Sequence, residues 1–240
     1  MEKKTSRGEL LKLLDYKKYF EFRNIKEAKK LQKFLASKII LRDTFEKIDL
    51  IGGADTSYSE KEKKILGVIV VLDFKTLNIV EISFDFHNEA FSYIPTFLSF
   101  REGLVIINSW LKLKTKPDIL IIDGQGYAHP RNLGIASHIG VVLDIPTIGC
   151  AKKPLIGKFI EPGLNKGDWE PIYYKNRKIG IVLRTKNNTK PLFISPGHRI
   201  SFETAMHIVL KTSIKYRLPE PIRLAHHYSK IGWLKFKEER

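Results

Sequence analysis

The chain has 240 residues, of which 43% are hydrophobic and 11% aromatic, and this content excludes an intrinsically disordered chain. Lys and Arg number 42 against 26 Asp and Glu. The resulting net charge of +16 favours a polyanionic partner, because phosphates that bind Lys or Arg release condensed counterions. The single cysteine, Cys150, excludes an internal disulfide and a zinc site built from several cysteines. We interpret it as a buried structural thiol.

No apolar run is long enough to cross a bilayer, and no long apolar stretch follows the charged residues 1–7. We therefore expect a cytoplasmic protein without membrane contact. The sequence contains no internal repeat, low-complexity tract or linker-like segment. This predicts a single domain over residues 1–240, and the basic surface favours a monomer.

The first half of the chain begins with a helix and continues with strands. Residues 25–40 carry apolar side chains at helical spacing with lysines between them, which predicts an amphipathic helix. Residues 47–54 predict a strand that leads into the functional site. Residues 66–74 and 78–86 predict two more strands, joined by a short turn. Together the three strands indicate an antiparallel meander.

The middle of the chain alternates between helices and strands. Pro95 predicts the start of a helix that runs to about Leu113, since proline suits the first helical turn. Residues 118–122 are almost continuously apolar, as in a strand that is buried on both faces. Residues 132–143 predict a helix, and residues 147–150 a short strand.

The last third of the chain is less regular. Residues 156–176 are rich in Gly, Pro, Asn and Lys and predict a loop. Residues 178–184 and 192–195 predict a late hairpin, and helices are expected near residues 202–210 and 222–228. The order of three strands, helix, strand, helix and strand resembles a ribonuclease-H-like α/β fold. We therefore expect a central mixed β-sheet flanked by helices.

Two aspartates follow predicted strands. Asp55 ends the first strand after Gly52 and Gly53, which allow another backbone or a ligand to come close. Asp123 ends the strand over residues 118–122, and ligands of α/β sheets bind beyond the carboxyl ends of strands. Taken alone, Asp55 is equally typical of an aspartate that starts a turn.

Glu102 is placed differently, on the helix predicted from Pro95. Its neighbours at helical spacing are the apolar residues Leu98, Val105 and Ile106. This spacing predicts a partly buried carboxylate, which must be paired or bound to a metal because an unpaired buried charge is costly. A salt bridge to a buried Arg or Lys is the alternative.

Together the three acids suit a hard cation. Mg²⁺ prefers carboxylate and water oxygens and retains several waters. Such a site can activate a water and neutralise charge on a scissile phosphate.

Several ordered motifs accompany these acids across residues 50–228. They are GAD at 53–55, YIP at 93–95, FRE at 100–102, DGQGYAHPR at 123–131, LGIASH at 133–138, PTIG at 146–149, SPGH at 195–198 and RLAH at 223–226. This series resembles the endonuclease V family.

The resemblance implies a ribonuclease-H-like fold and a DNA repair activity. Members of that family hydrolyse the second phosphodiester bond 3′ to a deaminated purine, typically deoxyinosine, and leave a 3′-hydroxyl and a 5′-phosphate. The resemblance implies DNA containing deaminated bases as the partner. It also implies that Asp55, Glu102 and Asp123 are the metal-binding acids, with Mg²⁺ as the cofactor and Mn²⁺ as an alternative.

Tyr93 matches the tyrosine that the family uses as a wedge. An aromatic ring can fill the gap that a base leaves in the stack, although a core tyrosine before a helix is the other interpretation. Here Ser92 stands where many members have proline, and Thr96 where glycine is common. The resemblance implies a nucleic-acid-binding and base-pocket set consisting of Tyr93, Ile94, Pro95, Thr96, Leu98, Gly124, Gln125, Gly126, Gly134 and Ile135.

Three further polar residues are candidates for catalytic roles. His129 lies six residues after Asp123, so a turn can bring it near the metal to orient water or contact a phosphate. Lys152 follows the strand over residues 147–150 and can hold the scissile phosphate as a point charge, although a surface lysine is the alternative. His226 can organise a metal-bound water or be a structural residue. Four more histidines are interpreted as structural or surface residues: His138, His198, His207 and His227.

Two alternatives to a DNA endonuclease remain at this point. The first keeps the fold and changes the substrate to inosine in single-stranded RNA, since nothing in the sequence visibly contacts or excludes a 2′-hydroxyl. The second is a non-catalytic nucleic-acid-binding protein that uses the +16 charge. Three converging carboxylates disfavour the second alternative, because negative charges do not help to bind phosphate.

Overall fold

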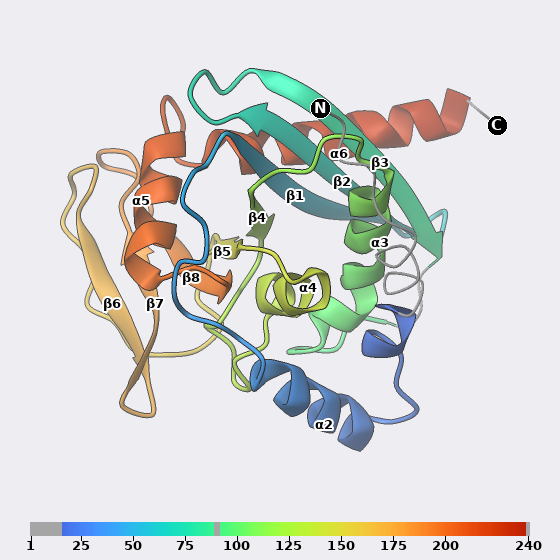
Figure 1. Cartoon of the computed structure of the whole chain (residues 1–240), viewed down its shortest axis with the longest axis horizontal. Helices are drawn as coiled ribbons and strands as arrows, with labels where there is room; N and C mark the ends of the chain where they lie inside the picture. The colour runs from blue at the N-terminus through green and yellow to red at the C-terminus, as the bar shows by residue number, and fades with distance from the viewer. Residues whose placement is uncertain (1–15, 89–91, 239–240) are drawn as a thin grey trace.

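The computed structural model describes residues 16–88 and 92–238 and shows one eight-stranded mixed sheet with helices on both faces (Figure 1). The order of strands across the sheet is β3-β2-β1-β4-β5-β8-β7-β6. The strands are β1 (Leu50–Ser59), β2 (Lys64–Asp73), β3 (Ile79–Asn88), β4 (Ile119–Asp123), β5 (Thr147–Ala151), β6 (Trp169–Tyr174), β7 (Arg177–Leu183) and β8 (Leu192–His198). The helices are η1 (Tyr16–Tyr19), α2 (Ile25–Ala36), α3 (Leu98–Lys112), α4 (Ile135–Leu143), α5 (Phe202–Thr212) and α6 (Glu220–Glu238).

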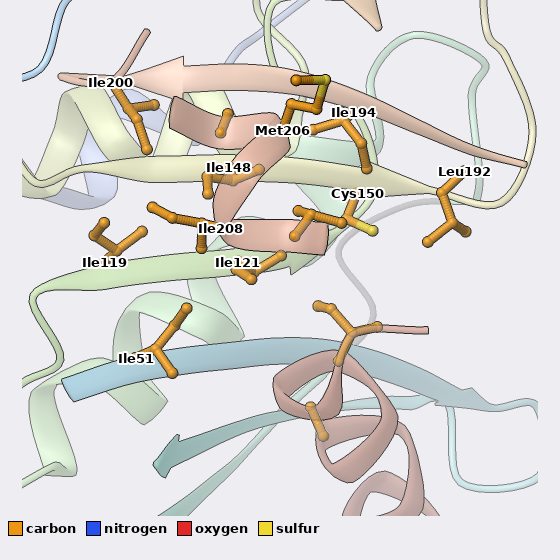
Figure 2. Packing of buried hydrophobic residues seen from close by; sticks show 14 of the residues in the cluster. Ile51, Ile119, Ile121, Ile148, Cys150, Leu192, Ile194, Ile200, Met206 and Ile208 are labelled. Atoms are coloured by element: carbon orange, nitrogen blue, oxygen red, sulfur yellow. The ribbon is translucent and has the colours of Figure 1, made fainter. Parts of the chain in front are cut away.

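The two faces of the sheet bury separate apolar layers. Helices α5 and α6 cover one face, where isoleucines of β1, β4, β5 and β8 meet side chains of α5 (Figure 2). Helices α3 and α4 cover the other face. Successive side chains of a strand point to opposite faces of the sheet. Whether a residue is at an odd or an even position along its strand, its parity, therefore decides which layer it joins. Burying one Ile or Leu side chain contributes about 1.5–3 kcal/mol, so these layers hold the sheet as a rigid platform.

The sheet brings two strands together in parallel at its centre. β1 pairs antiparallel with β2 over its full length and parallel with β4 from Ile51 to Ala54. β4 in turn pairs parallel with β5. The carboxyl ends of β4 and β5 therefore lie at one edge, beside the middle of β1.

Two expected boundaries near the site were wrong. Asp55 does not end its strand, because pairing with β2 continues β1 to Ser59. The helix after Pro95 begins only at Leu98, because Thr96 has a φ of +70° that no α-helix accepts.

Other segments differ from expectation in extent. The helix expected from residue 132 begins at Ile135, since Gly134 is still extended at its N-cap. α2 ends at Ala36, where Ser37 caps it, and not at residue 40. The loop expected over residues 156–176 contains β6, which pairs with β7, and α6 is much longer than residues 222–228.

No helix among the residues that the structure describes is long and apolar enough to span a membrane. The charged residues 1–7 lie outside the described part of the chain.

Candidate active site

Strand register places Asp55 and Asp123 side by side. Ala54 and Ile122 are partners in the parallel β1–β4 pair, so the next residue of each strand is an aspartate at the same level. Both share the parity of Ile51 and Ile121, which face the layer that contains α6. The two carboxylates therefore meet where β4 ends and α6 passes over β1.

Glu102 approaches the two aspartates from α3, which covers the other face of the sheet. Its carboxylate accepts a hydrogen bond of 2.7 Å from the Thr56 hydroxyl, and Thr56 directly follows Asp55 in β1. Burial raises the pKa of Glu102 above its ordinary value, and the negative charges of Asp55 and Asp123 raise it further, partly offset by the Thr56 bond. The structure therefore places the three acids close enough for their charges to interact, as the sequence predicts.

Asp55 is the most buried of the two aspartates, with 7% of its surface exposed. Burial raises its pKa, and the negative charge of Asp123 adds to the shift. His226 on α6 partly offsets the shift, because its Nδ1 lies 3.0 Å from the Asp55 carboxylate. A carboxylate only accepts hydrogen bonds, so Nδ1 donates and Nε2 is the acceptor nitrogen of a neutral His226.

Lys152 follows β5 and carries a positive charge to Asp123. Its ammonium lies 2.5 Å from the Asp123 carboxylate. Burial disfavours the charged lysine, but the hydrogen bond and charge of Asp123 outweigh burial, and the pKa of Lys152 is raised. A fully charged lysine therefore lies at the solvent-facing side of the acid cluster.

The acid cluster has the donor chemistry of a magnesium site. Within residues 16–88 and 92–238, no three His, Cys, Asp or Glu side chains lie close enough together to bind one metal ion as they stand. The three acids nevertheless offer only oxygen donors, and burial, followed by repulsion between the acids, raises the pKa of both Asp55 and Glu102. A divalent cation relieves both penalties, so the residues fit Mg²⁺ or Mn²⁺.

A cavity of about 240 Å³ opens directly after Asp123. Seven residues of the expected base pocket line it: Tyr93, Thr96, Leu98, Gly124, Gln125, Gly134 and Ile135. Leu98, Ile135 and other apolar side chains form walls, while backbone groups of the glycine-containing loop add polar edges. Tyr93 is 53% exposed and lies at the rim. Such a mainly apolar hollow with a few polar groups suits a planar base.

The other three expected pocket residues support the cavity without lining it. Ile94 packs against Phe97 and Phe100, and Pro95 lies in the turn that follows. The amide of Gly126 donates to the Ser195 hydroxyl at 2.9 Å.

Several lining residues were missed by the sequence analysis. They are Ser99, Leu133, Ala151, Lys153, Pro154 and Leu155. The segment after Lys152 is drawn into the wall because the Gln125 side chain donates to the Lys153 carbonyl at 2.9 Å. No residue type or spacing in that segment signals such a role.

His129 is buried and lines the cavity. Its Nδ1 accepts from the Arg131 amide at 3.2 Å, so Nε2 carries the proton and donates to the Thr96 carbonyl at 3.1 Å. Burial, and secondarily the charge of Arg131, lower its pKa to about 4. Both ring nitrogens are thus bound to backbone groups, those of Thr96 and Arg131, and these contacts do not support the expected role with water or phosphate.

The four histidines interpreted as structural or surface residues are buried with hydrogen-bond partners or exposed. His138 is buried between the Ser99 hydroxyl and the Tyr19 carbonyl. His198 is buried between the Ile40 amide and Asp144. His207 and His227 are exposed. Cys150 is buried in β5, as expected.

Known proteins match both the sequence and the fold. A family model described as endonuclease V matches residues 33–227. The chain belongs to the endonuclease V family. An endonuclease V of Dictyoglomus thermophilum is 56% identical over 218 residues, covering 90% of this chain and 95% of that protein. The chain is therefore a nuclease, and the alternative of a non-catalytic binding protein is wrong.

Solved structures of the family confirm the ribonuclease-H-like fold. The crystal structure of endonuclease V from Bacillus subtilis superposes with a TM-score of 0.86 at 30% identity, covering 92% of this chain and 97% of that chain. Endonuclease V from Ciona intestinalis superposes with a TM-score of 0.78 at 31% identity, covering 88% and 98%. That structure contains a 24mer DNA with an inosine followed by a ribo-adenosine.

Proposed function

We propose that this endonuclease V hydrolyses the second phosphodiester bond 3′ to deoxyinosine in DNA, depends on Mg²⁺, and leaves a 3′-hydroxyl and a 5′-phosphate. The observation that carries the proposal is the cavity for a planar base directly beside the acid cluster of Asp55, Glu102 and Asp123. The Ciona protein, bound to inosine-containing DNA, supports the choice of lesion.

The chain supplies a place for the base outside the duplex. An extruded hypoxanthine enters the cavity, where backbone groups of Gly124, Gln125 and Gly134 meet its polar edge. Tyr93 at the rim occupies the gap left in the stack, and such stacking contributes about 1–3 kcal/mol per base. A fixed pocket for the base also fixes which phosphate reaches the acids.

The phosphate is cut beside the pocket. Asp55, Glu102 and Asp123 would hold the metal, which supplies an activated water and neutralises charge on the phosphate. The Lys152 ammonium holds a phosphate oxygen as a point charge. His226, fixed by Asp55 through Nδ1, offers Nε2 to accept a hydrogen bond from the attacking water.

The decisive experiment is cleavage of an end-labelled duplex with one deoxyinosine, comparing the native protein with Asp123→Asn. A matched control is Asp49→Asn, which removes a carboxylate that is exposed and paired with Lys47. We expect one Mg²⁺-dependent product, cut one nucleotide beyond the lesion, with the native protein and the control only. An intact inosine duplex across a range of salt and of Mg²⁺ or Mn²⁺ would refute the proposal.

A second substrate, inosine in single-stranded RNA, has one specific observation in its favour. The ligand in the Ciona structure has a ribonucleotide directly after the inosine. Competition between DNA and RNA oligonucleotides of one sequence distinguishes the two substrates. Faster cleavage of RNA at equal concentration would replace DNA as the principal substrate.

A further inference from the structure

The wall of the cavity contains a turn with an unfavourable residue. The Phe97 amide donates to the Ile94 carbonyl at 3.0 Å, so residues 94–97 form a hydrogen-bonded β-turn. Pro95 occupies its second position, and Thr96 at the third has a φ of +70°. This is the pattern of a type II turn, whose third position normally requires Gly or Asn. A β-branched residue at positive φ is a genuine outlier, so other contacts must hold it.

Three side chains hold Thr96 in this conformation. Its carbonyl accepts from Gln32 Nε2 at 2.9 Å, from His129 Nε2 at 3.1 Å and from Arg131 Nη2 at 3.2 Å. Arg131 Nη2 also donates to the Thr96 hydroxyl at 2.6 Å. Arg131 is itself fixed, because its Nε donates to the Gln32 side-chain oxygen and its guanidinium lies 4.9 Å from the centre of the Phe97 ring.

Gln32 is a polar residue within the buried, otherwise apolar face of α2. It lies on the inner face of α2 with Ala28 and Leu35, and none of its surface is exposed. A buried amide is costly unless its groups are bonded. The bonds of Gln32 go to Thr96 and Arg131, so α2 is linked through this side chain to the cavity wall.

We propose that Gln32 and Arg131 are positioning residues that lock the Thr96 turn and thereby set the shape of the base cavity and the place of Tyr93 at its rim. The inference rests on the proposed function, because it assumes that the cavity receives the base. Tyr93, Thr96 and Leu98 all line the cavity, so relaxation of the turn moves three of its walls together.

The test is a pair of variants that separate locking of the turn from general folding. Gln32→Leu places an apolar side chain of similar size in the buried position and removes both bonds. Thr96→Gly removes the conformational strain, since glycine accepts positive φ without penalty. The control is Lys33→Met, the exposed neighbour of Gln32 on α2. Measurements are kcat and KM on an inosine duplex, and hydrogen exchange of the peptide over residues 92–100 in the protein without DNA.

We expect Gln32→Leu to raise KM about tenfold with kcat within about twofold, and to accelerate exchange of the turn about tenfold, since a tenfold population change is the scale of one hydrogen bond. Adding Thr96→Gly to Gln32→Leu should return KM to within about threefold of Thr96→Gly alone. A variant that merely weakens the fold would not be rescued in this way.

Three results would overturn the inference: unchanged exchange in Gln32→Leu, accelerated exchange with unchanged KM, or no rescue by Thr96→Gly. Failure of the proposed function is a different outcome, in which the native protein itself does not cut the inosine duplex. The exchange measurement needs no substrate, so it still decides whether Gln32 holds the turn.

Discussion

A single methyl group, added by Gly149→Ala, tests whether the position of the loop after Asp123 controls catalysis. Gly149 lies in β5 beside the loop of residues 124–126. An added Cβ would lie 2.2 Å from the Gly126 amide nitrogen and 2.6 Å from the Gln125 carbonyl carbon. Because both are backbone atoms, no side-chain rotation relieves the contact.

The size of the effect follows from these distances. Real Cβ contacts essentially never fall below 3.0 Å, so the loop must move by about 0.8 Å, the difference between 3.0 and 2.2 Å. A misplacement of about 1 Å can cost about 10²-fold in rate. Overpacking typically destabilises by about 1–3 kcal/mol, which is less than the 5–15 kcal/mol stability of ordinary domains. We therefore expect a folded protein with about 100-fold lower kcat/KM on inosine-containing DNA.

Kinetics on the inosine duplex and urea unfolding at 25 °C check this prediction. The control, Gly232→Ala on α6, places a Cβ 2.7 Å from Leu66 Cδ2 and 3.1 Å from Phe84 Cδ1, which are side-chain atoms away from the cavity. It should retain nearly native kinetics. The reasoning is refuted if Gly149→Ala retains native kcat/KM, or if both variants lose activity equally.

Further predictions concern charge, pH and reactivity. Lys152→Met should lower kcat/KM about 10²-fold. It should also make the slope of the logarithm of the DNA-binding constant against the logarithm of salt concentration shallower by about one, as for one lost phosphate contact. An unchanged slope would contradict this role of Lys152. Burial lowers the pKa of His138 from 6.5 to about 3, so the unfolded chain binds the extra proton between these values. The free energy of unfolding should therefore be unaffected by His138 above about pH 6.5 and should fall by about 1.4 kcal/mol per pH unit below it. Urea titrations at several pH values should find this slope reduced in His138→Gln. Burial strongly raises the pKa of Cys150, so a thiol reagent should label it only after unfolding, and rapid labelling of the native protein would disprove its burial.

Local patterns predicted most of the sheet and the two aspartates. The apolar run before Asp123 fixed β4 almost to the residue, because a strand buried on both faces leaves a continuous signature. The predicted end of β1 was wrong because the length of this strand depends on its pairing with β2, which is not a local property of the sequence. Asp55 still lies beside Asp123, because the parallel register of β1 and β4 sets its position wherever β1 ends; its role as a metal ligand stays a prediction.

The acid cluster was easier to predict than the pocket, for a physical reason. A carboxylate within an apolar pattern, as for Glu102, indicates by its own residue type that a charged or metal partner is required. The pocket uses backbone groups of Gly124 and Gly134 and a segment, residues 153–155, that joins the wall through one bond from Gln125. Backbone groups are the same at every position, so their use leaves little trace in the residue types.

Gln32 shows how a buried polar residue can extend this reasoning. It stands four residues after Ala28 and three before Leu35, inside the apolar stripe of α2, and that spacing alone predicts a buried amide. The cost of burying it then requires hydrogen-bond partners, but these lie 64 and 99 residues away, in Thr96 and Arg131. The sequence therefore predicts that Gln32 requires hydrogen-bond partners, but only the folded structure shows which residues they are. Because one of those partners has a backbone conformation that glycine would adopt freely, the same bonds that satisfy the amide also stabilise the turn. A helix distant from the acids thus acts on the site through a single side chain, which is why Gln32→Leu should alter KM without altering the acid cluster.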